Sequence, residues 1–536
     1  MFLLIDPPEV VHELDLGAES SLPFVVTAIY EDVSREVTDE VTWTSSNATL
    51  GAMDAESATF EIPAFTGNTV ESTVLTAEFA GATGRAQVTV AAYQQSGDNP
   101  DFFFVLPYAP DREQARDLAF STDVKAMDVF VNMDTTASMG PPINNLQAAV
   151  ASEIIPQAKS QIGDTQFGAG YFEDFPVGTY GAANHTKTGT DQPFVLSQPI
   201  TADADSVADA VFAYTDSGSP VGHGYDFPEA LIESLYQIAT GDGLDGPGDV
   251  YVAPNDAGIG GVGFRDGTMP VIVTVTDAVS HAPGEPNCLF NGHDVDIDYA
   301  DPPIEEAATR EQTKDALADI CARVVGIAVN SEESCSALSD ITDFAQATGA
   351  RVPPSIWDEG AGRPDGCADD ECCTGIDGAG VPPDTDGLCA LVYRVEEDGS
   401  GVDAGVVEGL AMLTRYAPFQ VTRALVGESS SVAGDALPEG RTTADFIKRV
   451  VPTSFGEPPL ASAPEPSMTE ITFEDVTPGT EVTFEIAAVN DFLQVPAGEA
   501  PRLFVAHIEV SAGSCADLDA RDVYVMVPPD NLPPPG

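Results

Sequence analysis

Three oxygen-bearing side chains alternate in one short loop of the sequence. Asp134, Thr136 and Ser138 follow directly after the apolar residues 129–133. The length of that apolar run predicts a buried parallel strand, and open α/β sheets bind their ligands at the carboxyl ends of such strands. One carboxylate and two hydroxyls are hard oxygen ligands, which favour Mg²⁺, Ca²⁺ or Mn²⁺ over zinc or copper. We therefore expect a divalent cation site at the end of this strand.

Three further segments end in acidic loops, in a fixed order along the chain. Residues 167–176 and 271–278 read as strands that run into acidic residues, and residues 224–231 open a helical pattern. Together with the D-x-T-x-S loop, these segments resemble the von Willebrand factor A domain and its metal-ion-dependent adhesion site. The resemblance implies a doubly wound, mostly parallel, Rossmann-like sheet. It also implies a Mg²⁺ or Mn²⁺ ion held by Asp134, Thr136, Ser138, Glu229 and Asp277, the two aspartates acting directly or through water.

The middle loop is most similar to the version of this domain found in integrin β subunits. That version carries D-x-P-E, which Asp226, Pro228 and Glu229 match here. The resemblance implies a second cation, with Ca²⁺ as the candidate ion, held by Asp174, Asp226, the Pro228 carbonyl and Glu229. Integrin β subunits place two acidic residues for a third cation where this chain has residues 139–142, Met-Gly-Pro-Pro, so we expect no third site.

The composition restricts the partners of the chain. Its 536 residues carry 87 acidic and 21 basic side chains, for a formal charge of −66. A binding surface for nucleic acid or anionic membrane needs basic patches, so we expect neither partner. The acidic field favours divalent cations, although the same composition also fits a saline habitat. No apolar run long enough for a membrane-spanning helix occurs, and residues 1–5 are too short for a signal peptide, so a targeting segment is expected to be missing from the chain.

Eight cysteines lie in the second half of the chain, at 288, 321, 335, 367, 372, 373, 389 and 515. Their even number and loop-rich surroundings favour disulfides and an oxidising compartment. Zinc is the alternative, but the cluster lacks C-x2-C pairs. We therefore predict an extracellular or cell-surface protein.

The length of the chain indicates several domains. Residues 1–94 contain short β-rich runs separated by turns and resemble bacterial immunoglobulin-like sandwiches. Residues 100–125 and 418–530 also read as strands, and we expect them to form one split sandwich that the A domain, residues 126–417, interrupts, as in the hybrid domain of integrin β subunits. The fold class expected is thus multidomain, α/β plus all-β.

Within residues 126–417 the pattern alternates between strands and helices. Helices are predicted at residues 143–155, 230–239, 309–323, 335–348 and 403–416. Two insertions interrupt the pattern. Residues 283–303 carry Asp294, Asp296 and Asp298, which suit either a solvated loop or a calcium site. Residues 363–389 read as a disulfide-pinned loop, with or without a bound calcium, and either insertion is expected to border the face that carries the metal site.

No catalytic motif is found in the sequence. It lacks a G-x-S-x-G elbow, an H-E-x-x-H pair and a phosphate-cradling glycine loop, and we expect His281 to have a packing or supporting role. We therefore expect no enzymatic activity.

The first hypothesis for the function is an adhesion protein whose cation binds an Asp or Glu of a protein partner. The alternative is a structural subunit of an extracellular fibre, coat or stalk that binds copies of itself, with the metal only bracing the loops. A third possibility, an A domain that binds no metal, conflicts with the intact set of oxygen ligands.

The insertion of the A domain into the split sandwich suggests a further hypothesis. If the last helix, residues 403–416, shifts when a ligand binds, the attached sandwich should pivot, as in integrins.

Overall fold

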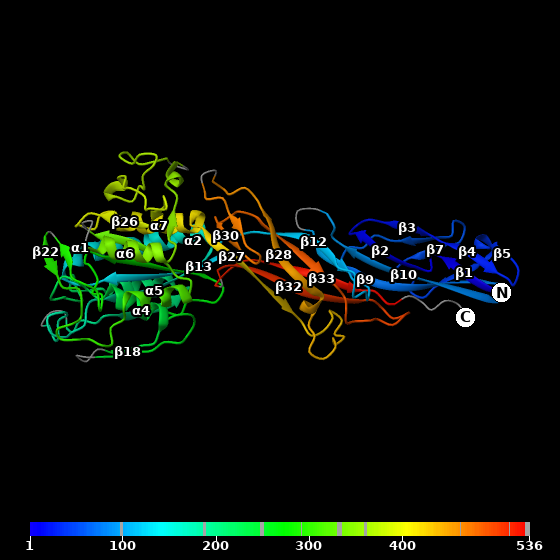
Figure 1. Ribbon diagram of the computed structural model, residues 1–536, viewed down its shortest axis with the longest axis horizontal. Coiled ribbons are helices and arrows are strands. Elements are labelled where there is room, and N and C mark those ends of the chain that lie inside the picture. The colour runs from blue at the N-terminus through cyan, green and yellow to red at the C-terminus, as the bar shows by residue number, and fades with distance from the viewer. Residues whose placement is uncertain are drawn as a thin grey trace.

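The computed structural model describes residues 1–96, 100–185, 189–246, 251–290, 292–329, 335–358, 362–460, 463–513 and 515–530. The molecule is elongated, with an α/β part at one end and two β-sandwich parts following it along the long axis (Figure 1). The coarse expectation of a mixed α/β and all-β protein is confirmed. Residues 94–100, whose polar sequence predicts a linker, and the proline-rich residues 527–536 lie partly outside the described residues. Among the described helices, none is both long and apolar enough to cross a membrane.

A six-stranded sheet forms the centre of the α/β unit, residues 126–417. Its strand order is β15-β14-β13-β20-β23-β26, and every pair is parallel except β14 with β15. The three central strands are almost wholly buried, as their continuous apolar sequences predict. The bounds are Ala126–Asp134 (β13), Asp164–Phe172 (β14), Val195–Thr201 (β15), Met269–Thr276 (β20), Arg323–Val329 (β23) and Val392–Val395 (β26).

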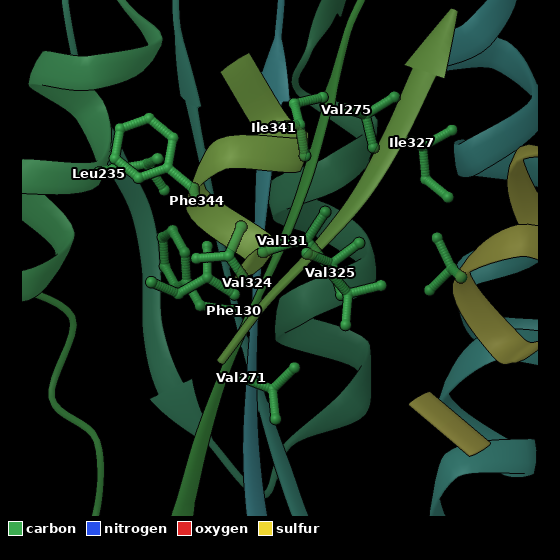
Figure 2. Close-up of a cluster of buried hydrophobic side chains, with 14 of the residues drawn as sticks. Phe130, Val131, Leu235, Val271, Val275, Val324, Val325, Ile327, Ile341 and Phe344 are labelled. Atoms are coloured by element: carbon green, nitrogen blue, oxygen red, sulfur yellow. The ribbon is translucent and has the colours of Figure 1, made fainter. Parts of the chain in front are cut away.

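Helices cover both faces of this sheet. A Cβ at Gly326 of β23 would meet Ile341 of α6, whereas Gly405 and Gly409 of α7 face Ile327 and Val325. Since alternate residues of a strand point to opposite faces, α6 and α7 lie on opposite sides, and Figure 2 shows the buried side chains packed between these layers. The helices are Gly140–Ala149 (α1), Ile155–Gln161 (α2), Ala204–Phe212 (α3), Leu231–Thr240 (α4), Arg310–Asp319 (α5), Ala337–Ala347 (α6) and Val402–Tyr416 (α7).

The first helical segment is longer than the sequence pattern predicts. It was expected at residues 143–155, but α1 begins at Gly140 and α2 continues to Gln161 through a π-helical turn, Val150–Ile154. Pro141 and Pro142 stand at the start of α1, where their missing N–H groups cost nothing. The π turn absorbs an extra residue and keeps Val150 and Ile154 buried.

The N-terminal sandwich is built from residues 2–93. Three small sheets, β1-β4-β5, β2-β10-β9-β6 and β3-β8-β7, enclose a core of their own. Burial alternates along β1 and β4, as expected for strands with one face in a core. The strands are Phe2–Asp6 (β1), Glu9–Asp15 (β2), Ser20–Pro23 (β3), Val25–Ile29 (β4), Ser34–Glu36 (β5), Thr42–Ser45 (β6), Ala52–Asp54 (β7), Thr59–Ile62 (β8), Thr69–Phe79 (β9) and Ala82–Tyr93 (β10).

The split sandwich combines strands from both sides of the α/β unit in the sequence. One sheet has the order β11-β33-β32-β27-β30-β29 and the other β12-β31-β28, around a third core. The strands are Phe102–Val105 (β11), Gln114–Phe120 (β12), Phe419–Gly427 (β27), Ile447–Phe455 (β28), Ser467–Met468 (β29), Phe473–Val476 (β30), Val482–Ala488 (β31), Arg502–Ala512 (β32) and Ala516–Val527 (β33). The assignment of these parts to the named domain families stays a prediction.

Specific contacts join the three parts. Tyr93 of the N-terminal sandwich stacks on Phe103 of the split sandwich, with ring centroids 4.3 Å apart, and Phe103 stacks on Tyr524. At the other joint, a disulfide between Cys321 and Cys515 ties the α/β unit to the β32–β33 hairpin. The α/β unit is therefore attached to the split sandwich by both ends of its chain and by a covalent cross-link.

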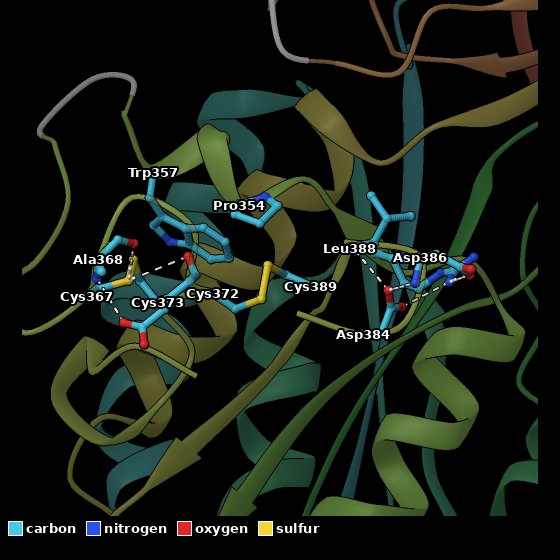
Figure 3. Close-up of a disulfide and its surroundings, with 12 residues drawn as sticks. Pro354, Trp357, Cys367, Ala368, Cys372, Cys373, Asp384, Asp386, Leu388 and Cys389 are labelled. Carbon is cyan, nitrogen blue, oxygen red and sulfur yellow. Dashed lines mark hydrogen bonds and ion pairs between the residues drawn. A yellow bond between two sulfur atoms is a disulfide. The ribbon is translucent and has the colours of Figure 1, made fainter. Parts of the chain in front are cut away.

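All eight cysteines form disulfides, which confirms that expectation over a zinc site. Cys367–Cys373 and Cys372–Cys389 pin the second insertion, and Figure 3 shows it beside Pro354 and Trp357. Arg351 forms ion pairs with Asp384 and Asp386 in the same insertion. These contacts place the second insertion beside β24 (Arg351–Val352) and β25 (Cys389–Ala390).

Candidate metal centre

The carboxyl ends of β13, β14 and β20 meet at the end of the α/β unit that is remote from the sandwiches. The parallel register places Asp134 of β13 beside Phe172 of β14, and Met133 beside Val275 of β20. The loops that follow these strands therefore lie side by side. We call this end of the unit the loop face; it also includes residues 221–230, which precede α4, and the hairpin of β21 (Cys288–Phe290) and β22 (His293–Val295) (Figure 1).

Asp134 is fully buried and accepts hydrogen bonds only from neutral donors. Its Oδ1 accepts from the Thr136 amide at 2.9 Å and the Thr136 hydroxyl at 2.7 Å, and its Oδ2 accepts from the Thr276 hydroxyl at 2.6 Å. Burial, followed by repulsion from Asp277, raises the pKa of Asp134 to about 7. The carboxylate form is therefore costly unless a cation is nearby.

Glu229 is the second buried carboxylate of this group. Its backbone is held by hydrogen bonds to Val279 and His281, 2.9 Å each, which fix the loop before α4 against the loop after β20. Of the described residues, none donates a hydrogen bond to its Oε2. Burial raises the pKa of Glu229 well above its usual range, and repulsion from Asp134 and Asp174 adds to this effect.

A glycine leaves room for the Glu229 carboxylate. Gly224 has a φ of +65°, and a Cβ there would lie 2.4 Å from Oε1 of Glu229. The left-handed backbone and the close approach both require glycine at this position. In the sequence, Gly224 is recognisable only as the first residue of the segment 224–231, so this role could not be predicted from it.

The remaining residues predicted for the first site adjoin Asp134 and Glu229. The Ser138 hydroxyl donates to Asp277 Oδ1 at 3.2 Å, and Thr136 contacts Asp134 as described above. All five predicted residues, Asp134, Thr136, Ser138, Glu229 and Asp277, thus come together at the loop face. Their role as metal ligands stays a prediction.

The second predicted set contains a residue that the sequence analysis left out. Asp174 and Asp226 do lie together, in the loops after β14 and before α4, but the side chain of His281 lies between them. Pro228 is buried between Asp226 and Glu229 in the same loop. Only its position four residues after Asp277 could have indicated that His281 faces the metal loops.

The first insertion borders the loop face, whereas its aspartates have local structural roles. Asp298 accepts a hydrogen bond from the Gly284 amide at 2.8 Å, and Asp296 caps the turn at Asp298. From the same insertion, Tyr299 is fully buried and donates to Asp174.

The donor set fits a divalent cation. Among the ion pairs of the described residues, no Lys or Arg pairs with Asp134, Asp174, Asp226, Glu229 or Asp277. Buried carboxylates without cationic partners are costly unless an ion neutralises them. The Oε2 atom of Glu229, which has no hydrogen-bond partner among the described residues, can serve as an oxygen ligand of such a cation.

Comparison with known proteins adds little to this description. No family model matches the chain, and no curated protein matches it. Among solved structures, the crystal structure of the pilus adhesin SpaC from Lactobacillus rhamnosus GG, in an open conformation, aligns with 92% of this chain at 11% sequence identity and a TM-score of 0.30. The alignment spans 55% of that adhesin chain, and a score this low carries no argument about fold or function.

Proposed function

We propose that this protein is an extracellular, non-enzymatic binding protein that uses a Mg²⁺ or Mn²⁺ ion on the loop face to capture an acidic group of a protein partner. One observation carries the proposal: several buried carboxylates converge at the ends of parallel strands without any Lys or Arg partner among the described residues. The order of the loops and their resemblance to the von Willebrand factor A domain support the same conclusion. The disulfides fit an oxidising, extracellular location.

In this proposal Thr136, Ser138 and Glu229 supply oxygen ligands from three sides. Asp134 orients the Thr136 hydroxyl through its 2.7 Å hydrogen bond, and Asp277 does the same for Ser138. A Mg²⁺ ion keeps exchangeable water positions, so it would offer a local positive charge to a partner carboxylate. The strongly acidic chain could not attract that carboxylate otherwise.

Exposed apolar side chains lie beside these loops and suit contact with a protein. Tyr225 is 53% exposed and Leu289 is 59% exposed. Phe227 packs on Phe290 of the β21–β22 hairpin, with ring centroids 4.8 Å apart. A partner that presents an apolar side chain next to its carboxylate would bury this surface.

The test is calorimetric titration of Mg²⁺ and of Mn²⁺ into chelator-stripped protein, in enough NaCl to suppress diffuse binding to the acidic surface. We expect saturable binding that Asp134→Ala weakens by about 10- to 100-fold, the usual effect of losing a residue that orients a metal ligand. Asp294→Asn removes a charge from an exposed position on the same face and serves as the control. Equal heats in all three proteins would show that cations only condense on the surface. The structural-subunit alternative would then lead, and sedimentation velocity in EDTA would test it.

A further inference from the structure

A second group of side chains on the loop face contains a nitrogen donor. The Nε2 atom of His281 lies 3.2 Å from Oδ2 of Asp174 and 3.4 Å from Oδ2 of Asp226. One potential ligand atom from each residue falls within 4.8 Å of the others. His281 and Asp174 are almost completely buried, whereas the Asp226 side chain is 29% exposed and provides an opening to solvent.

Two buried atoms of this group lack a hydrogen-bond partner. Nε2 of His281 and Oδ2 of Asp174 lie 3.2 Å apart, yet neither is hydrogen-bonded to a described residue, and Oδ1 of Asp226 also has no partner there. A buried imidazole nitrogen and a buried carboxylate oxygen that are close together without a hydrogen bond can both be satisfied by an ion bound between them.

The opposite edges of the same side chains are fixed by hydrogen bonds. Nδ1 of His281 donates to the Ile297 carbonyl at 3.2 Å, and Oδ1 of Asp174 accepts from the Phe175 amide at 2.6 Å and from the Tyr299 hydroxyl. The His281 ring also stacks on Tyr299, with centroids 4.1 Å apart. Ligating histidines and carboxylates in metalloproteins are held in this way, by their non-ligating edges.

The spacing agrees with tetrahedral coordination. Metal–ligand distances of about 2.0–2.1 Å in tetrahedral zinc sites put neighbouring ligand atoms about 3.3 Å apart. The two measured separations, 3.2 and 3.4 Å, bracket that value. We propose that Asp174, Asp226 and His281 bind a divalent transition-metal ion of the zinc class, through one imidazole nitrogen and two carboxylate oxygens.

This site differs from the Asp134 site in its ligand chemistry. Imidazole suits zinc and its transition-metal neighbours, whereas Mg²⁺ and Ca²⁺ prefer oxygen donors alone. The three residues come from three loops of the loop face, after β14, before α4 and after β20, so a bound ion would tie these loops together. The inference stands on these residues alone and does not depend on the function proposed above.

A proton on His281 is the competitor of the metal. Burial lowers the pKa of His281, but Asp174 and Asp226 outweigh this effect and raise it to about 10. An imidazolium could therefore neutralise the two carboxylates without any metal. Metal binding must displace any proton on Nε2 of His281.

The test uses Co²⁺ as a coloured substitute for zinc, added to the untagged, chelator-stripped full chain. We expect one equivalent of Co²⁺ to give the intense visible absorption of a nitrogen-ligated tetrahedral ion. Zn²⁺ should displace it. His281→Gln should abolish the absorption. His507→Gln, which removes an exposed histidine paired with Asp522, is the control and should preserve it.

Two further variants keep the result interpretable. Asp226→Asn alters a partly exposed ligand and should also abolish the absorption if His281→Gln fails to fold, as judged by circular dichroism. Asp134→Ala should leave the absorption intact, which separates this site from the Mg²⁺ site. Absence of Co²⁺ binding by the folded wild type, or an unchanged spectrum in folded His281→Gln, would overturn the proposal and leave His281 as a built-in cation.

Discussion

Two buried aspartates on the same strand differ in whether a cationic side chain neutralises them. Asp128, near the start of β13, accepts hydrogen bonds from Nε and Nη2 of Arg265 at 2.8 and 2.7 Å, from the Arg265 amide and from the Thr268 hydroxyl. Asp134, at the end of β13, accepts only from hydroxyls and an amide. Both aspartates are fully buried.

The contrast with Asp128 indicates that the absence of an arginine beside Asp134 has a functional reason. The chain has few basic residues, yet it uses Arg265 to neutralise Asp128 and also to pair with Asp164. Among the ion pairs of the described residues, the only cationic group that pairs with a carboxylate of the two candidate metal sites is the imidazole of His281. The protein itself therefore neutralises Asp128, at the end of the sheet that faces the split sandwich, whereas Asp134 at the opposite end has no Lys or Arg partner among these ion pairs.

The largest expected effect on stability comes from removing the arginine that neutralises Asp128. Arg265→Ala leaves Asp128 buried and unpaired, which should lower the free energy of unfolding by about 3–5 kcal/mol. Chemical denaturation measures this change. Arg449→Ala removes an exposed arginine paired with Glu113 and Glu485 and should leave the free energy of unfolding nearly unchanged. A similar small cost for Arg265→Ala would remove the contrast between the two ends.

Removing the charge of Asp134, at the other end of β13, should stabilise the protein when no cation is present. Because the pKa of Asp134 rises from 3.8 to about 7 on folding, its protonated form favours the folded state. This contribution is fully present below about pH 4 and is lost as the pH rises through about 7. Asp134→Asn should therefore stabilise the metal-free protein at pH 8 by on the order of 2 kcal/mol, with little effect at pH 4.

Thermal unfolding of the EDTA-treated proteins at the two pH values tests this prediction. Asp294→Asn, with its exposed side chain, is the charge-matched control. With saturating Mg²⁺ at pH 8 the order should reverse, because only the wild type can bind the ion. Destabilisation by Asp134→Asn in EDTA at pH 8 would mean that the carboxylate is already neutralised within the protein.

The smallest expected effect on Mg²⁺ binding comes from changing the space around the Glu229 carboxylate and not its charge. Gly224→Ala places a methyl group against Glu229 Oε1 and should weaken Mg²⁺ binding about tenfold, or 1.4 kcal/mol. Gly218→Ala is the matched control, since Gly218 also has a positive φ, +84°, but has open space around its Cβ position. Equal Mg²⁺ affinity in the two variants would show that the Glu229 carboxylate does not need this space.

The sequence was most informative where its apolar runs were continuous. Residues 129–133 and 271–276 could be predicted as buried strands because nearly every side chain is apolar or small, and parallel pairing then brings their final residues together. Asp134, Thr136, Ser138, Glu229 and Asp277 could therefore be predicted to be neighbours. Short runs were less informative: residues 470–473 have the composition of a strand, but the strand of this region lies at Phe473–Val476.

Contacts between distant segments could not be read from local patterns. The Cys321–Cys515 disulfide joins residues 194 positions apart, and eight cysteines allow 105 pairings. The position of His281 depends on Tyr299 and Ile297, which come from an insertion whose path the sequence does not define. The prediction of the second metal set therefore lacked its histidine.

The covalent link between the α/β unit and the split sandwich has a mechanical consequence. If a ligand held at the loop face is pulled away from the N-terminal sandwich, the load crosses the joint through three covalent paths: the chain entering β13, the chain leaving α7 and the Cys321–Cys515 bond. Two chain crossings that lie close together could act as a hinge, but a third attachment at the β32–β33 hairpin resists bending about them. Under tension this joint should therefore resist bending, and reduction of the Cys321–Cys515 disulfide should allow it to bend more easily.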